Sequence, residues 1–258
     1  MREILIVIPY LASEAQGNEI EYCLEGWRRH FKEPFRIRIA IIGDYPENLR
    51  GYYVFDHIPC PRVAPPENPD MYHPHFDLVN KFTQAAKAYR DKFDGFIYSC
   101  DDYYAVNDFG LGEVLTPKIN GWEIVGDANH PNGFKRDKAR TAAVLRENGY
   151  PTMNWTTHLP VYFEFDKLLE IFRKFDMRRR SLVIEDMYFN IYQGTRKPFL
   201  LDVLADPFKL GIYTSEPDPA MIRMAFRDKV WITNSPTGWV PALKDALEEY
   251  YFGDGRKR

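Results

Sequence analysis

The first hundred residues alternate short apolar runs with longer segments in which apolar side chains recur every three or four positions. The apolar runs cover residues 4–8, 37–42, 52–58 and 95–98, and the helical spacing covers residues 20–31 and 78–93. Short apolar strands that alternate with amphipathic helices are typical of a mostly parallel sheet with helices on both faces. The sequence therefore predicts an α/β fold, in which ligands bind beyond the carboxyl ends of the strands.

The second half of the chain has a looser pattern. It predicts a strand at residues 122–125 and helices at residues 137–147, 165–175, around Glu185 and at 241–251. The proline-rich stretch at residues 59–75 is expected to be a loop over the sheet edge, serving as a lid or as a plain surface connection. We find no repeat and no linker, so we expect one domain over residues 1–258, with an α/β half to residue 110 and a mixed half after it.

Charge and cysteine usage exclude several classes of protein. The net charge is −3, so no global positive field attracts the chain to nucleic acid. Three cysteines without a CxxC pair indicate neither a disulfide framework nor a zinc knuckle. The apolar run at residues 4–8 is shorter than the core of a signal peptide, and we find no apolar stretch near the ~20 residues of a membrane helix. We therefore expect a cytoplasmic protein without a transmembrane segment.

Aromatic residues make up 16% of the chain, with 17 Tyr and 18 Phe. Tyr combines a flat apolar face with a polar tip, which suits pockets for rings such as bases and sugars. A large mixed core with Tyr at its edge explains the same composition.

Two adjacent carboxylates, Asp101 and Asp102, follow the fourth predicted strand. Such a pair repels itself unless a cation or water neutralises it, and hard oxygen ligands suit Mg²⁺ or Mn²⁺. A turn or helix cap is the alternative interpretation of the pair. The first strand runs into Pro9 and Tyr10 and not into a glycine-rich phosphate loop, so a dinucleotide fingerprint or a P-loop is not indicated. A metal on the acidic pair would supply the missing counter-charge for phosphate.

The order of these segments resembles the GT-A glycosyltransferase fold, a Rossmann-like sheet. The likeness rests on Pro9-Tyr10 and Gly43-Asp44 at strand ends, on the acidic pair and on the Glu185-Asp186 helix start. Four segments are similar to Stealth-type sugar-phosphate transferases, namely residues 17–22, 41–44, 101–102 and 157–160. The likeness spans roughly residues 1–195 and leaves the last 60 or so unassigned. The motif departs from the usual pattern, because Asp-Asp-Tyr replaces Asp-x-Asp and Cys100 stands where Stealth proteins have Asn.

The resemblance implies a metal-dependent transfer of a sugar from a nucleotide-sugar donor to an acceptor hydroxyl. Asp101 and Asp102 would hold Mn²⁺ or Mg²⁺, with Asp101 also at the donor. Pro9, Tyr10 and Asp44 would hold the base and ribose, and Asn80 or Lys81 would reach phosphate.

Three further residues are candidates for catalysis. Asp186 and Glu185 are candidate general bases for the acceptor hydroxyl, with Asp186 preferred, although acids in a first helical turn also oppose the helix dipole. His158 is a candidate ligand, base or structural hydrogen-bonder.

The sequence is also compatible with other functions. A Stealth-like sugar-1-phosphate transferase and a non-catalytic nucleotide-sugar-binding protein share the expected fold. A sugar nucleotidyltransferase is less well supported, because no glycine- and arginine-rich loop follows the first strand. The acceptor is open among a sugar, a lipid, a protein and a modified nucleobase.

Overall fold

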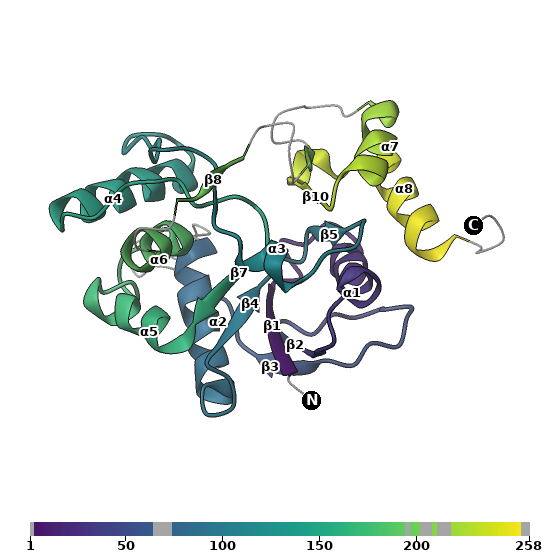
Figure 1. Ribbon diagram of the computed structural model, residues 1–258, viewed down its shortest axis with the longest axis horizontal. Helices are drawn as coiled ribbons and strands as arrows, with labels where there is room; N and C mark the ends of the chain where they lie inside the picture. The colour runs from purple at the N-terminus through teal and green to yellow at the C-terminus, as the bar shows by residue number, and fades with distance from the viewer. Residues whose placement is uncertain (1–2, 64–73, 194–196, 202–207, 211–217, 254–258) are drawn as a thin grey trace.

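The computed structural model describes residues 3–63, 74–193, 197–201, 208–210 and 218–253 (Figure 1). The strands are β1 (Glu3–Tyr10), β2 (Arg36–Gly43), β3 (Asp56–Pro59), β4 (Gly95–Tyr98), β5 (Tyr103–Ala105), β6 (Lys118–Ile119), β7 (Val161–Glu164), β8 (Phe199–Leu200), β9 (Phe208–Leu210) and β10 (Trp231–Asn234). The helices are α1 (Glu19–His30), α2 (Pro74–Tyr89), α3 (Leu111–Leu115), α4 (Gly133–Glu147), α5 (Phe165–Lys174), α6 (Ile184–Tyr192), α7 (Pro219–Asp228) and α8 (Pro241–Phe252), with a short 3-10 turn, η1 (Pro236–Gly238). The α/β class is confirmed.

The main sheet has five strands in the order β3-β2-β1-β4-β7. Strands β3, β2, β1 and β4 run parallel, whereas β7 pairs antiparallel with β4. The predicted mostly parallel sheet is therefore corrected to a mixed one. The physical reason is that β7 follows a long excursion through α3, β6 and α4 and returns to the sheet in the opposite direction (Figure 1).

Alternate side chains of the central strands build two separate cores. Leu5 and Val7 of β1 face one core with residues of α2, α4, α5 and α6, and Ile6 and Ile8 face the other with residues of α1. This period of two is what a strand covered on both faces requires. In Figure 1, α1 accordingly lies on one side of the sheet and α2 on the other.

The C-terminal part packs against the first half of the chain through a second sheet of three strands. Its order is β5-β10-β9, with β10 antiparallel to β5 and parallel to β9. Helices α7 and α8 pack a third core in which Tyr22 of α1 and Tyr104 of β5 are fully buried. Because β5 follows β4 after a four-residue turn, this arrangement brings the end of β10 to the end of β4.

Most of the predicted elements of the first half are confirmed, but one predicted strand in each half differs. The strand expected at residues 52–58 is reduced to β3, and Tyr52 and Val54 are 93% and 74% exposed. The strand expected at residues 122–125 does not form, and Trp122 and Val125 lie exposed. Apolar residues that find no partner strand remain at the surface, which the local pattern does not reveal.

The remaining element predictions fall partly on described residues. The helices expected at residues 137–147, 165–175, around 185 and at 241–251 are confirmed as α4, α5, α6 and α8. Of the predicted proline-rich loop, Pro59 ends β3 and Pro74 begins α2, while residues 64–73 lie outside the described residues. Within the described part of the chain, none of the helices is both long enough and apolar enough to cross a membrane.

Candidate functional site

A cavity of about 210 Å³ opens where the strand order reverses, between the carboxyl ends of β1 and β4. From β1 the chain proceeds outward to β2 and β3, and it then crosses through α2 to place β4 on the other side of β1. Such a switch point is where open α/β sheets bind ligands, because the two connections diverge and leave a crevice. We call it the switch-point cavity. Its lining residues are Pro9, Tyr10, Leu11, Glu14, Gln16, Glu19, Pro74, Asp77, Leu78, Lys81, Tyr98, Cys100, Asp101, Asp102, Asn234, Ser235 and Pro236.

The acidic pair lies in the turn between β4 and β5, and both side chains line this cavity. Burial, and then the nearby charge of Glu19, raise the pKa of Asp101 to about 7. Burial and the charge of Asp101 hold the pKa of Asp102 well above its ordinary value, although Asp102 Oδ2 accepts a hydrogen bond from Thr233 Oγ1 at 3.1 Å. The two carboxyls are therefore placed where an added positive charge would be strongly stabilised.

Glu19, at the start of α1, adds a third carboxyl to the lining of the cavity. We call Glu19, Asp101 and Asp102 the acidic wall. Its side chain is 3% exposed, and burial raises its pKa. Asn234 Nδ2 donates to Glu19 Oε1 at 2.6 Å, and the hydroxyl of Tyr104 donates to Asn234 Oδ1 at 2.6 Å. Residues from α1, β5 and the end of β10 thus fix the acidic wall in one geometry.

Lys81 supplies positive charge to the same cavity. It is 1% exposed and forms an ion pair with Asp77 one turn earlier in α2. Its charge opposes the rise in the pKa of Asp101. The backbone makes room for it at Gly43, where φ is 132° and an added Cβ would lie 2.9 Å from Lys81 Cε and 1.9 Å from the carbonyl oxygen of Tyr10. Only glycine fits this close approach of β1, β2 and α2.

The strand end Pro9-Tyr10 forms another part of the lining, as the sequence predicts. Burial raises the pKa of Tyr10 to about 12, and the charges of Asp101 and Asp44 act in the same direction. Asp44 is not among the lining residues. Its Oδ2 accepts a hydrogen bond from Ala12 N at 2.9 Å, so it holds the loop that follows β1.

Asn80 does not lie in the switch-point cavity, although it is the neighbour of Lys81. Its Nδ2 donates to Cys60 Sγ at 3.1 Å, and it lines a different hollow with Val63 and Phe76. Adjacent helical residues point about 100° apart, and here Lys81 faces the switch-point cavity while Asn80 faces the other hollow. The predicted phosphate-side role of Asn80 is corrected on this ground.

Asp186 lies in a buried hydrogen-bond network and does not line the switch-point cavity. Its Oδ2 lies 2.6 Å from Lys138 Nζ, and its Oδ1 accepts from the backbone N–H of Trp155 at 2.7 Å. Lys138 Nζ also donates to Asn154 and Thr156, each at 2.6 Å. Asp186 therefore anchors the loop before β7 to α4, and the structure does not place it next to the acidic pair.

Glu185 and His158 are the two other candidates for catalysis, and neither lines the switch-point cavity. Glu185 is 7% exposed, its Oε2 has no hydrogen-bond partner among the described residues, and burial raises its pKa to about 7. Its Oε2 is 3.9 Å from His75 Nδ1. Burial raises the pKa of Tyr98 on the cavity wall, and the charge of Glu185 acts in the same direction. His158 adopts a left-handed backbone with φ of 57°, in the turn that leads into β7.

The acidic wall fits a divalent cation that also holds phosphate. Among the described residues there is no group of three or more His, Cys, Asp or Glu side chains arranged to enclose a metal. Mg²⁺ and Mn²⁺ at nucleotide sites need only one or two carboxylates, because the phosphates and water complete the shell. Asp101 and Asp102 supply that number, and both line the cavity.

Sequence reasoning missed Glu19, Thr233 and Asn234. The last two belong to the C-terminal part, which the motif pattern left unassigned. A local signal does exist, since the apolar run at residues 230–232 is followed by the polar residues Thr233, Asn234 and Ser235. Nothing in that run says that it pairs with β5, which is what brings it to the cavity.

No protein-family model matches this chain, and a search of curated proteins finds no match.

Proposed function

We propose that the protein is a metal-dependent glycosyltransferase with a GT-A-like fold, which binds a nucleotide-sugar donor in the switch-point cavity. The observation that carries the proposal is that Asp101 and Asp102, from the end of β4, face one cavity together with Pro9-Tyr10 from β1 and Lys81 from α2. A diphosphate-linked ligand requires strand-end segments to contact it, a positively charged side chain such as Lys81 near the phosphates, and a carboxylate pair to hold a metal ion.

The chain's own residues divide the binding between them. Asp101 and Asp102 would hold Mn²⁺ or Mg²⁺, and Thr233 and Asn234 keep the acidic wall in place through Asp102 and Glu19. The metal, when bound, would stabilise negative charge on the leaving diphosphate. Lys81, already balanced by Asp77, contributes to the field around the phosphates. Tyr10 offers a ring face and a hydroxyl at the end of β1, suited to the base and ribose.

The acceptor proton requires a separate base. Asp186 is not suited to this step, because both of its oxygens accept hydrogen bonds from buried donors. Glu185 is the remaining candidate, since burial raises its pKa to about 7 and one of its oxygens lacks a hydrogen-bond partner in the described structure, but it does not line the switch-point cavity. A pKa near the working pH is what makes a general base effective.

The test is donor binding by calorimetry, with UDP-, GDP- and CDP-linked sugars, each with and without Mn²⁺. We expect at least one donor to bind in a Mn²⁺-dependent manner, and Asp102→Asn to weaken it at least tenfold. Asp245→Asn, an exposed carboxyl on α8, is the matched control and should bind like the wild type. Unchanged affinity in Asp102→Asn would count decisively against the metal role.

The engagement of Asp186 with Lys138 favours one second candidate, a nucleotide-sugar-binding protein that does not catalyse transfer. Tight donor binding without hydrolysis or transfer would support it. Product analysis separates the two transfer reactions, since sugar transfer releases a nucleoside diphosphate and sugar-phosphate transfer releases the monophosphate.

A further inference from the structure

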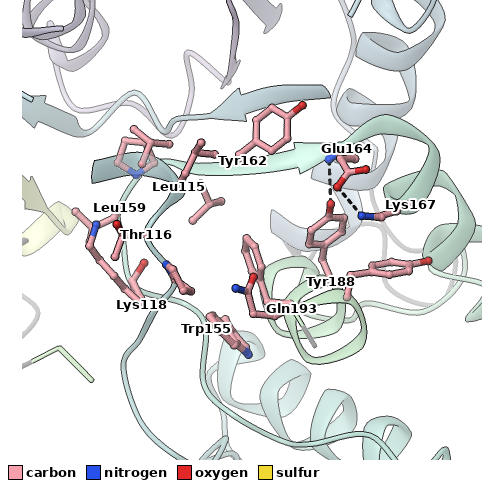
Figure 2. Close-up of a pocket in the computed structure, with 17 residues that line it drawn as sticks. Leu115, Thr116, Lys118, Trp155, Leu159, Tyr162, Glu164, Lys167, Tyr188 and Gln193 are labelled. Atoms are coloured by element: carbon pink, nitrogen blue, oxygen red, sulfur yellow. Dashed lines mark hydrogen bonds and ion pairs between the residues drawn. The ribbon is translucent and has the colours of Figure 1, made fainter. Parts of the chain in front are cut away.

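A second cavity of about 330 Å³ lies along β7, one of the two edge strands of the main sheet (Figure 2). Its walls come from α3, β6, the loop before β7, the start of α5 and the end of α6. The volume is within the range of roughly 300–1,000 Å³ that small-molecule sites occupy. The function proposed above does not use this cavity.

Aromatic side chains form much of its wall. They are Trp155, Tyr162, Tyr188, Phe189 and Tyr192. The Trp155 and Phe189 rings pack at 5.2 Å between centroids, and the hydroxyl of Tyr188 accepts a hydrogen bond from Glu164 N at 3.0 Å. These contacts hold the rings in place before a ligand arrives, which lowers the entropic cost of binding.

The charged groups at this cavity are balanced within the protein. Lys167 Nζ lies 2.5 Å from Glu164 Oε1, and Lys118 Nζ lies 2.6 Å from Glu113 Oε1. Among the described lining residues, these pairs leave no excess positive charge to attract a phosphate or a carboxylate. Thr116, Thr157 and Gln193 add neutral hydrogen-bonding groups between the rings.

The geometry points to a neutral saccharide as the ligand of this cavity. A pyranose ring offers an apolar face of C–H groups, which packs on aromatic rings, and a rim of hydroxyls that both donate and accept hydrogen bonds. Aromatic faces beside paired Lys and Glu groups, an amide and hydroxyls match that chemistry. A charged sugar would have to disrupt an internal ion pair to gain a counter-ion.

The position of the cavity suits an acceptor. Tyr98 at the end of β4 lines the switch-point cavity, and its register partner Val161 on β7 lines the aromatic one. Cα atoms paired across antiparallel strands lie about 4.5–5.5 Å apart, so the two cavities border adjacent strands at the same end of the sheet. That the bound saccharide is the acceptor rests on the proposed function, whereas its binding does not.

The test is ligand-observed NMR with a defined panel. It contains the methyl glycosides of glucose, galactose, mannose and N-acetylglucosamine, the disaccharides lactose, maltose and cellobiose, and the charged comparators glucose 6-phosphate and glucuronate. We expect a neutral member to bind, and Tyr192→Ala and Gln193→Ala each to weaken it at least fivefold. Tyr150→Ala is the matched control, because Lys174 Nζ lies 5.3 Å from the Tyr150 ring centre much as Lys167 Nζ lies 5.7 Å from that of Tyr192. Its affinity should be unchanged.

Three results would overturn the inference. They are no binding by any neutral member, equal affinity in wild type and Tyr192→Ala, and tighter binding of the charged comparators. The Asp102→Asn variant separates this inference from the proposed function. If the wild type and Asp102→Asn bind the saccharide equally while no nucleotide sugar binds the wild type, the saccharide site stands and the glycosyltransferase proposal fails. If a nucleotide sugar binds and no neutral saccharide does, the saccharide site fails and the glycosyltransferase proposal stands.

Discussion

Replacing Asp101 by Asn should make the folded protein more stable at pH 8 and leave its stability nearly unchanged at pH 4. Burial and the charge of Glu19 raise the pKa of Asp101 from 3.8 to about 7. The folded state therefore holds the proton more tightly than the unfolded state, and the wild type loses stability as pH rises from about 4 to 7. Asn cannot ionise, so the variant escapes this loss.

The size of the effect follows from the difference between the two pKa values. At about 1.36 kcal/mol per pKa unit, the rise from 3.8 to about 7 corresponds to roughly 4 kcal/mol. Asp101 is only partly buried, because one side borders the cavity, and solvent screening reduces this figure. We expect a gain of about 2 kcal/mol in the free energy of unfolding at pH 8, with the pKa of Asp102 falling as well once its neighbour is neutral.

The assay is urea unfolding at pH 4 and pH 8 in the presence of EDTA, repeated at pH 8 with Mn²⁺. Mn²⁺ should stabilise the wild type by mass action and stabilise Asp101→Asn much less. Asp245→Asn serves as the control and should respond to pH and metal as the wild type does. A variant that is less stable than the wild type at pH 8, or a difference that is equal at both pH values, would refute the reasoning about buried charge.

Two further predictions concern residues that hold the structure together, Gly43 beside the switch-point cavity and Asp186 in its buried network. Gly43→Ala should lower the free energy of unfolding by about 1–3 kcal/mol and weaken donor binding, because the added Cβ would meet the Tyr10 carbonyl and Lys81. Gly112→Ala is the control and should not be destabilising, because nothing lies within 4 Å of the added Cβ. Thermal unfolding measures the stability of each variant, and calorimetry measures its donor binding. Asp186→Asn should lower the free energy of unfolding, measured in urea, by about 3–5 kcal/mol, because Lys138 is left charged and buried without its partner. The folded variant should keep its Mn²⁺-dependent donor binding. Loss of that binding in a fully folded variant would contradict the anchoring role of Asp186.

Local chemistry explains why so much of the α/β half could be predicted. In β1, Leu5 and Val7 face one core and Ile6 and Ile8 the other, so a continuous apolar run was the correct signal for a strand buried on both faces. The apolar positions of α1 recur on one helical face and are buried there. The acidic pair and Pro9-Tyr10 were each predicted to follow a strand, and both line the switch-point cavity.

The same reasoning failed where a contact depends on distant parts of the chain. Asp186 and Asp102 are both acids beside apolar segments, and sequence gives no means of telling that one is held by Lys138 and the other faces a cavity. Asn80 and Lys81 are neighbours, and the choice between them depended on which face of α2 meets β1 and β2.

Periodicity and strand-end chemistry determined the alternation of strands and helices and the position of the acidic pair after the fourth strand, because these follow from interactions within a few residues of one another. The parallel direction of the first four strands was predicted from their alternation with helices. Tertiary structure alone decided that β7 enters in the opposite direction, that β10 brings Asn234 to Glu19, and that aromatic residues from α6 and the loop before β7 surround a second cavity. Those outcomes depend on which apolar surfaces cover each other across long stretches of chain, and the free energy that selects them is gained only when the whole sheet and its helices pack together.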